Sequence, residues 1–276
     1  MTNAADTRNM AVFCDFENVA LGVREAKYEK FDISKVLERL LLKGSIVVKK
    51  AYCDWDRYKD FKAPMHAASF ELIEIPHVRQ SGKNSADIRM VVDALDLCYT
   101  KSHVDTFVIV SGDSDFSPLV SKLRENDKTV IGVGVKKSTS DLLVAACDEF
   151  IYYDDLVREQ KARRPAARRK APKESSAPAP AALAKEDEGK QEDKKQEAID
   201  LVLGTVEALV DERGEDETIW GSMVKQALKR RKPGFNEKYY GFGSFNHLLE
   251  EARSRHLLDL ERDEKSGGYS VRLTEE

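Results

Sequence analysis

Cysteine is scarce in this sequence of 276 residues, and long apolar runs are absent. The cysteines are widely spaced, form no Cys-x-x-Cys pair and each lie in an apolar stretch, so we expect reduced core residues instead of disulfides or zinc ligands: Cys14, Cys53, Cys98 and Cys147. The first ten residues contain no apolar signal region, and no run approaches the roughly 20 apolar residues of a membrane span. These absences predict a cytoplasmic protein with no membrane partner.

The sequence also lacks an excess of positive charge and a glycine-rich phosphate loop. Its 45 Lys and Arg residues face 49 Asp and Glu residues, which gives a formal net charge of −4. The whole chain therefore does not look like a nucleic-acid binder, and any such role must be local or depend on a cation that reverses the charge of an acidic site. No Gly-x-Gly-x-x-Gly or P-loop pattern follows the first apolar run, which disfavours a small-molecule binding role.

The first part of the chain, residues 1–156, alternates strand-like and helical patterns from residue 10 onward. Strands alternating with helices predict a parallel sheet covered on both faces, which is a three-layer α/β fold. Such sheets bind ligands at the carboxyl ends of their strands. We expect strands at 10–14, 45–52, 71–76, 106–110, 129–135 and 149–153, and helices at 34–43, 56–70, 86–99, 116–125 and 140–146.

The remaining sequence predicts a linker and a second, smaller domain. Residues 157–194 are rich in Arg and Lys, then in Ala, Pro and Ser, and then in mixed charges, a composition typical of a flexible linker. The second domain, residues 195–276, has helical patterns at 196–212, 222–231 and 242–253, and strand patterns at 256–261 and 268–273. Three helices and a terminal hairpin predict a winged-helix-like α+β domain.

Acidic residues stand where the predicted elements of the first domain end or begin. Asp15 ends the first strand, Asp113 and Asp115 follow strand 106–110, and Asp87 begins the helix at 86–99. Because the ends of parallel strands meet at one edge of a sheet, we expect all four to surround one pocket. The alternative for each acid is an ordinary helix-cap or turn role, and Asp115 in particular is placed to cap the helix at 116–125.

Carboxylates gathered in one pocket repel one another unless a cation neutralises them. Oxygen ligands without accompanying Cys or His residues favour Mg²⁺ or Mn²⁺ over zinc, and such an ion polarises a phosphodiester and activates a water molecule. Asn18 is suited to donate to a phosphate or to orient a water molecule without adding charge. Lys83, between small and polar neighbours, is a candidate phosphate contact.

Three motifs of the first domain carry a family resemblance. They are residues 13–18 (Phe-Cys-Asp-Phe-Glu-Asn), residues 86–94 around Asp87, and residues 111–116 (Ser-Gly-Asp-Ser-Asp-Phe). In this order they closely resemble the NYN domain of the PIN-like nucleases, over about residues 10–155. The resemblance implies a PIN-like fold and metal-dependent ribonuclease activity, with RNA as the partner. It also implies the site residues: metal-binding and catalytic Asp15, Asp87, Asp113 and Asp115, with Asn18 beside them.

The second domain resembles the OST-HTH, or LOTUS, domain, which implies RNA binding. The matching residues are 221–235 and 240–245. Independently, a basic cluster is followed by aromatic residues, a combination that suits phosphate contact and base stacking: Lys229, Arg230, Arg231, Lys232, Tyr239 and Tyr240. Basic residues at the end of a helix also complement the helix dipole, which is the alternative explanation of the cluster. We expect Phe242 and Phe245 to be core residues.

The sequence leaves rival functions open. A haloacid-dehalogenase-like phosphatase needs a second Asp two residues after the first, and here Glu17 follows Asp15. A non-catalytic RNA-binding or scaffold protein stays open, because intact acids are necessary for cleavage and not sufficient. The sequence also leaves open whether a homodimer assembles a shared site. A metal-dependent ribonuclease is the function that the patterns favour.

Overall fold

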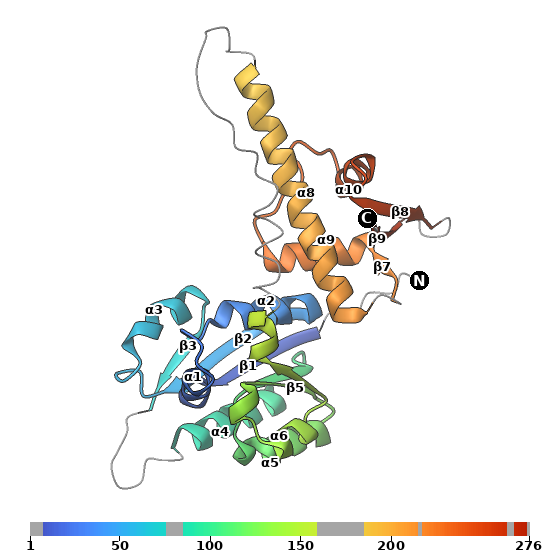
Figure 1. The fold of residues 1–276 in the computed structure, drawn as a ribbon. Coiled ribbons are helices and arrows are strands. Elements are labelled where there is room, and N and C mark those ends of the chain that lie inside the picture. Colours follow the sequence, from blue (N-terminus) through green and yellow to red (C-terminus); the bar gives the residue numbers. More distant parts are fainter. Residues whose placement is uncertain (1–7, 76–84, 159–184, 215–216, 264–267, 275–276) are drawn as a thin grey trace. The chain divides into compact units, whose positions relative to one another are not determined.

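The computed structural model describes residues 8–75, 85–158, 185–214, 217–263 and 268–274 (Figure 1). They fall in two compact units, one within residues 6–171 and the other within residues 172–276. Among these described residues, no helix combines the length and the apolar character needed to cross a membrane.

A six-stranded sheet forms the centre of the first unit, and every neighbouring pair of its strands is parallel. The strand order is β3-β2-β1-β4-β5-β6, so the chain starts in the middle, proceeds to one edge and then returns to fill the other half. The direction of winding reverses between β1 and β4, and sheets of this kind bind ligands at the carboxyl ends of the strands where the winding reverses. The strands are β1 Arg8–Asp15, β2 Gly44–Cys53, β3 Glu71–Glu74, β4 Thr106–Val110, β5 Thr129–Gly134 and β6 Glu149–Tyr152.

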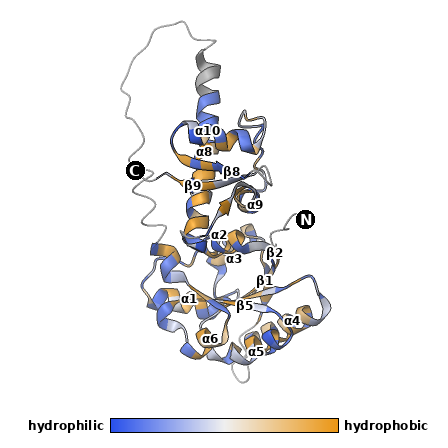
Figure 2. Cartoon of the chain, turned by 90° about the vertical axis from the view of Figure 1, so that its right-hand side faces the viewer, coloured by the Kyte–Doolittle hydropathy of each residue, from blue (hydrophilic) through white to orange (hydrophobic). Residues whose placement is uncertain are grey.

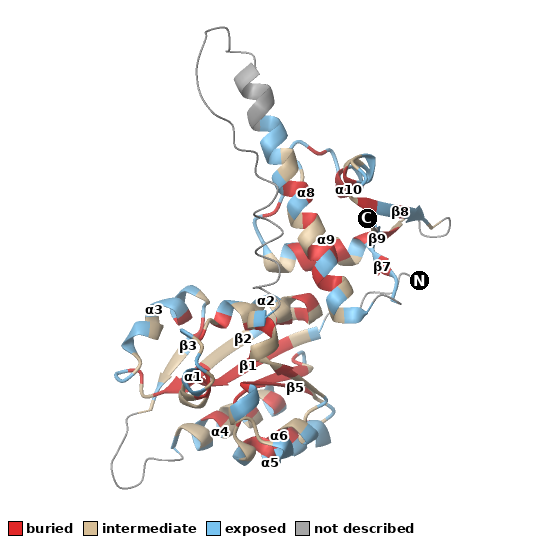
Figure 3. Cartoon of the chain, in the orientation of Figure 1, coloured by how far each residue is buried: buried red, intermediate tan, exposed pale blue. Residues whose placement is uncertain are grey.

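Helices cover both faces of this sheet, as the alternating sequence patterns predicted. In β1, Val12 and Cys14 pack with one set of helices, whereas Ala11 and Phe13 pack with the other set. Buried residues accordingly follow the strands and the inner sides of the helices (Figure 3). Hydrophobic residues are frequent in the same elements (Figure 2). One face carries α1 Phe16–Glu25, α2 Ile33–Lys43 and α3 Lys59–Ala67, and the other carries α4 Ser85–Thr100, α5 Ser117–Glu125 and α6 Asp141–Ala146, with short 3-10 turns η1 Ser114–Phe116 and η2 Lys136–Ser138.

Helix α1 has no counterpart among the predicted elements. It begins at Phe16 directly after β1, and Asp15 is both the last residue of the strand and the N-cap of the helix. No turn residue separates the two elements, and this concealed the boundary. The buried residues Val19 and Val23 have the spacing of a helix face.

The second unit combines three helices with a small antiparallel sheet. Its predicted hairpin is present as β8 and β9, and a short strand, β7, pairs with β9 to complete a sheet of order β7-β9-β8. Phe242 and Phe245 are both 4% exposed, so the prediction of core positions is confirmed. The elements are α8 Lys185–Arg213, β7 Ile219–Trp220, α9 Gly221–Arg231, α10 Phe245–Ser254, β8 Leu258–Arg262 and β9 Tyr269–Leu273.

Helix α8 begins earlier than predicted. It starts at Lys185, within the residues expected to form the linker, instead of near residue 196. The additional residues are mostly Lys, Glu, Gln and Asp, of which Lys, Glu and Gln have good intrinsic helix propensity. A composition that cannot form a core is therefore compatible with a solvated helix.

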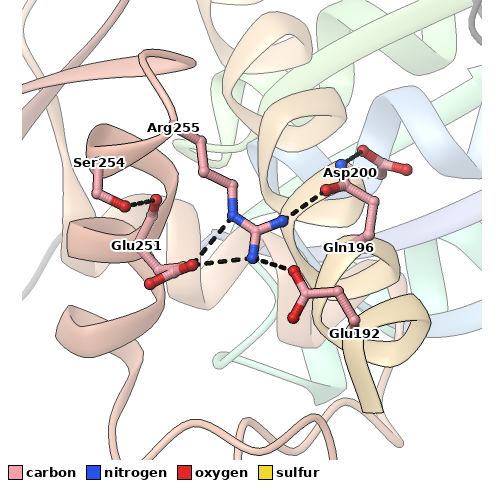
Figure 4. A network of polar contacts seen from close by, with 6 residues as sticks. All are labelled: Glu192, Gln196, Asp200, Glu251, Ser254 and Arg255. Carbon is pink, nitrogen blue, oxygen red and sulfur yellow. Dashed lines mark hydrogen bonds and ion pairs between the residues drawn. The ribbon is translucent and has the colours of Figure 1, made fainter. Parts of the chain in front are cut away.

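Arg255, directly after α10, joins α10 to α8 (Figure 4). Its guanidinium donates from Nε and Nη2 to Glu251 Oε1, at 3.0 and 2.8 Å. It also donates from Nη1 to Gln196 Oε1 at 2.9 Å and from Nη2 to Glu192 Oε1 at 2.6 Å. One side chain thereby holds two turns of α8 against the end of α10.

Replacing this side chain tests its role as a link. We expect Arg255→Ala to lower the free energy of unfolding by about 1 kcal/mol, because the ion pairs are partly exposed to solvent. Hydrogen exchange should accelerate locally in residues 191–200 of α8. Arg253→Ala, at an exposed position of the same helix, is the control. Equal exchange in both variants would show that Arg255 does not hold the helices together.

Candidate active site

Two of the predicted acids lie at the ends of the neighbouring strands between which the sheet reverses its winding. Asp15 is the last residue of β1 and is only 7% exposed. Asp113 follows β4, the neighbour of β1, and caps η1 by accepting a hydrogen bond from the Asp115 backbone N–H at 3.0 Å. Asp87 lies in the first turn of α4. The carboxyl edge of the sheet therefore gathers acids from three distant segments of the chain.

Hydrogen bonds hold the Asp15 carboxylate in one orientation. The Ser111 hydroxyl donates to Asp15 Oδ2 at 3.0 Å, and the Asn18 backbone N–H donates to Oδ1 at 3.3 Å. Ser111 is itself fully buried and accepts from the Asp113 backbone N–H at 3.2 Å. Ser111 therefore links the two acids, a role that the sequence motif alone did not reveal.

Asn18 has a structural contact in addition to its predicted role. Its Oδ1 accepts a hydrogen bond from the Gly112 backbone N–H at 2.9 Å, which ties the start of α1 to the loop after β4. The amide carbonyl is therefore engaged, and Nδ2 is the group that faces the predicted task of donating to a phosphate.

Gly112 permits this loop to pack closely against residues 138–140. A Cβ atom at this position would lie 2.2 Å from the Ser138 carbonyl oxygen, a contact with backbone that no side-chain movement relieves. The Gly112 carbonyl also accepts from the Ser140 backbone N–H at 2.9 Å. The glycine of the Ser-Gly-Asp motif is therefore required by packing.

The charges of the predicted acids act on one another, whereas their role as site residues stays a prediction. Burial, and then the charge of Asp87, raise the pKa of Asp15 to about 7, with a smaller contribution from Asp113 and partial compensation by the hydrogen bonds from Asn18 and Ser111. Burial also raises the pKa of Asp87, followed by the charges of Asp113, Asp115 and Glu17. Mutual repulsion of this kind is what a bound cation would relieve.

Glu17 is an acid near the site that the motif analysis gave no role. Its charge reaches Asp87, and its Oε1 pairs with Arg57 at 3.2 Å. The ion pair with Arg57 partly balances the negative charge of Glu17, so we assign Glu17 to the rim of the site. Lys83 lies outside the described residues.

The donor set fits a hard divalent cation, because it consists of carboxylate oxygens without Cys or His. Within the described ranges, however, no three acidic, His or Cys side chains already converge as a metal cluster. Asp15 is fixed, whereas Asp87 and Asp113 are partly exposed and Asp115 is exposed. A cation held by all of these acids would therefore require rotation of the freer side chains toward Asp15.

Asp93, in the same motif as Asp87, belongs to a separate network. It accepts from Tyr52 Oη at 2.8 Å, from Arg89 Nε at 3.0 Å and from Lys50 Nζ at 3.4 Å. Although burial opposes it, the hydrogen bond from Tyr52 and the nearby cations hold the pKa of Asp93 below its usual value. The charge of Asp93 is therefore balanced by nearby cations. The residue has a structural role on a different side of α4 from Asp87.

In the second unit, the basic cluster separates into two kinds of residue. Lys229 and Lys232 are exposed. Arg230 is half-buried, and burial, followed by the charge of Arg213, lowers its pKa. Arg231 donates to the Gly204 carbonyl at 3.5 Å. Because successive residues of a helix point in different directions, the four basic residues at the end of α9 cannot share one face.

The two tyrosines also differ. Tyr239 is 65% exposed, whereas Tyr240 stacks on Phe235 with ring centroids 5.3 Å apart. Lys194 Nζ lies 5.0 Å from the Tyr239 ring centroid, a cation from α8 that the sequence did not associate with this site. Tyr239 is therefore the exposed aromatic ring, with a lysine beside it.

The parallel α/β fold of the first unit is consistent with the PIN-like fold of NYN domains. The family model of the NYN domain matches residues 9–154, and the chain belongs to this family. An uncharacterized protein of Methanocaldococcus jannaschii is 32% identical over 124 residues, which cover 44% of this chain and 47% of the relative, so the match spans about half of that protein. A crystal structure of a protein of unknown function from Vibrio parahaemolyticus is similar with 27% identity and a TM-score of 0.49, covering 56% of this chain and 98% of the other.

The raised pKa of Asp15 predicts a pH-dependent stability. Because the carboxyl holds its proton more tightly in the folded protein than at the unfolded value of 3.8, stability falls as pH rises from about 4 to about 7. Asp15→Asn removes this ionisation and keeps the capping oxygen. In EDTA, we expect the variant to match wild type in urea unfolding near pH 4 and to exceed it at pH 8, by roughly 4 kcal/mol at most. Parallel pH profiles would contradict the burial of an ionised Asp15.

Proposed function

We propose that this NYN protein is a Mg²⁺- or Mn²⁺-dependent ribonuclease that hydrolyses phosphodiester bonds of RNA. The observation that carries the proposal is the mutual repulsion of Asp15, Asp87 and Asp113 at the reversal point of the sheet. Such repulsion destabilises the protein without a cation. Once a cation is bound, each carboxylate is attracted to it. Membership of a nuclease family supports the same function.

The chain's own residues would divide the work as follows. A divalent cation, when bound, neutralises the carboxylates and makes hydroxide available near neutral pH. Asp15, Asp87 and Asp113 would hold it, and the exposed Asp115 would complete the set. Asn18 Nδ2 would donate to a phosphate oxygen. A water molecule that gives up a proton would add to phosphorus as the bond to the 3′ oxygen breaks. The 3′ oxygen would take a proton from solvent, which leaves a 5′-phosphate and a 3′-hydroxyl.

The fixed orientation of Asp15 supports a role as the central ligand. Its two hydrogen bonds and its burial mean that it need not reorganise when substrate arrives, which favours catalysis. Because its pKa is near 7, cation binding below neutral pH would have to displace a proton. Cation affinity should therefore increase as pH rises through this value.

We further propose that residues 195–276 form an OST-HTH/LOTUS-like, winged-helix RNA-binding domain. Helices α8 to α10 followed by the hairpin β8–β9 support this proposal, as do the exposed Lys229, Lys232 and Tyr239. Joined to the catalytic domain, residues 1–156, by the intervening linker, such a domain would raise the effective concentration of RNA at the acids. Lys83 is a proposed phosphate contact of the catalytic domain.

Cleavage of labelled single-stranded RNA tests the proposed activity. We expect wild type to cut with Mg²⁺ or Mn²⁺ and not with EDTA, and Asp15→Asn and Asp113→Asn to lose activity by on the order of 100-fold or more, because each removes a cation ligand. Asp96→Asn, an exposed acid on α4, is the matched control. RNA binding by wild type without cleavage of any substrate would instead favour a non-catalytic RNA-binding protein.

Charge reversal in α9 and its C-cap tests the proposed RNA-binding domain. Lys229→Glu combined with Lys232→Glu should weaken affinity for long RNA, and the plot of log affinity against log salt should become shallower by about one to two. The control combines Arg253→Glu and Arg272→Glu, two other exposed cations of the same unit. If the variant with Lys229→Glu and Lys232→Glu kept the salt slope of wild type, the basic cluster would not belong to the RNA interface.

A further inference from the structure

An open pocket of about 750 Å³ borders the candidate active site. Its lining comes from α4, η1, α5 and α6, and it includes two of the site acids, Asp87 and Asp115. The volume lies within the range of about 300–1,000 Å³ that is usual for small-molecule sites. A group that fills this pocket would therefore lie beside two of the acids proposed to hold the cation.

Aliphatic side chains on the pocket wall are exposed to solvent. Ile88 is 62% exposed, Val92 is 55% exposed, and Leu142 from α6 is 63% exposed. Ile88 and Val92 are four residues apart on α4, so they lie on one side of the helix. Neighbouring apolar side chains exposed in this way indicate a surface that gains free energy when a ligand covers it.

A buried hydroxyl in the wall also calls for a hydrogen-bonding partner. Ser117 is 8% exposed and lines the pocket, and among the described residues its Oγ has no hydrogen-bond partner. A buried hydroxyl without a partner is costly, and such groups are rare in folded proteins. Rotation of the Ser117 side chain toward the pocket would let an occupant with a hydrogen-bonding edge satisfy this hydroxyl.

We propose that this pocket is a subsite for one nucleobase of the RNA substrate, next to the bond that is cut; this inference rests on the proposed ribonuclease function. A nucleobase has apolar faces, a hydrogen-bonding edge and no net charge. The two acids at the pocket edge disfavour an anionic occupant, whereas the sugar attached to a base carries the phosphate toward those acids. The aliphatic wall would contact the face of the base, and Ser117 Oγ, buried in the free protein, would bond to its edge after rotation of the side chain.

The subsite predicts that one base near the cut is read by the protein. In short RNAs with a mapped cleavage position, an abasic nucleotide at one flanking position should lower kcat/KM about 10-fold, mainly through KM. Val92→Ser should reduce this discrimination, because it removes apolar contact with the base. Val47→Ser, at a valine of β2 that is 46% exposed, should leave the discrimination as in wild type.

Ser117→Ala separates a binding role from a role in folding. Because the hydroxyl has no partner among the described residues, its removal should leave the free energy of unfolding unchanged or raise it. The same variant should discriminate less between the intact and the abasic RNA. A clear loss of stability, with discrimination retained, would overturn the assignment of Ser117.

Photo-cross-linking of the full chain distinguishes failure of the subsite from failure of the nuclease. RNA containing 4-thiouridine, bound in Ca²⁺, should cross-link to the peptides that contain Val92 or Leu142. If wild type cuts RNA but every abasic substrate is cut equally and cross-links map elsewhere, the subsite is wrong and the nuclease stands. If cross-links map to the pocket while no RNA is cut, the pocket stands and the nuclease is wrong. A dimer that Val92→Ser dissociates in sedimentation would assign the pocket to a second copy and overturn the subsite.

Discussion

Repulsion among carboxylates at the end of β1 and β4 is the interaction on which the rest of the site depends. Asp15 is buried, although burial and its acidic neighbours oppose its ionisation. The surrounding structure tolerates this cost by holding the carboxylate with Ser111 and the start of α1. Those contacts in turn require a tight loop after β4, and the loop requires a glycine against the Ser138 carbonyl. Stability is given up locally to keep acids together, a pattern that occurs where a protein is built for function instead of for maximum stability.

The layered fold was predictable because strand-like and helical patterns alternate regularly along the first part of the chain. All six predicted strands are present, and the parallel sheet that their alternation with helices implied explains why acids far apart in sequence meet at one edge. Asp15, Asp87, Asp113 and Asp115 were predicted to gather at one pocket. The charges of Asp87 and Asp113 act on Asp15, and that of Asp115 acts on Asp87, whereas a shared site of all four stays a prediction. A strand-end rule sufficed for this prediction, because it needs the topology of the sheet and no detail of packing.

What the sequence could not supply depends on tertiary contacts. Helix α1 was missed because strand and helix join without a turn, and the early start of α8 was missed because charged residues suit a helix and a linker equally. Four adjacent basic residues looked alike, yet burial separates Arg230 from the exposed Lys229. Ser111 and Ser117 are both serines of the same stretch, and only the structure shows that one holds an acid whereas the other faces a pocket. Composition does not encode which neighbour a side chain meets.

The contact between Gly112 and the turn at residues 138–140 has a consequence for synthesis of the chain. The carboxylate of β1, the loop after β4 and this turn support one another only when all three have left the ribosome. A nascent chain that ends before residue 138 contains every site acid and still lacks the support for the loop that carries Asp113. The arrangement around Asp113 is therefore completed only after the chain has been synthesised beyond residue 140.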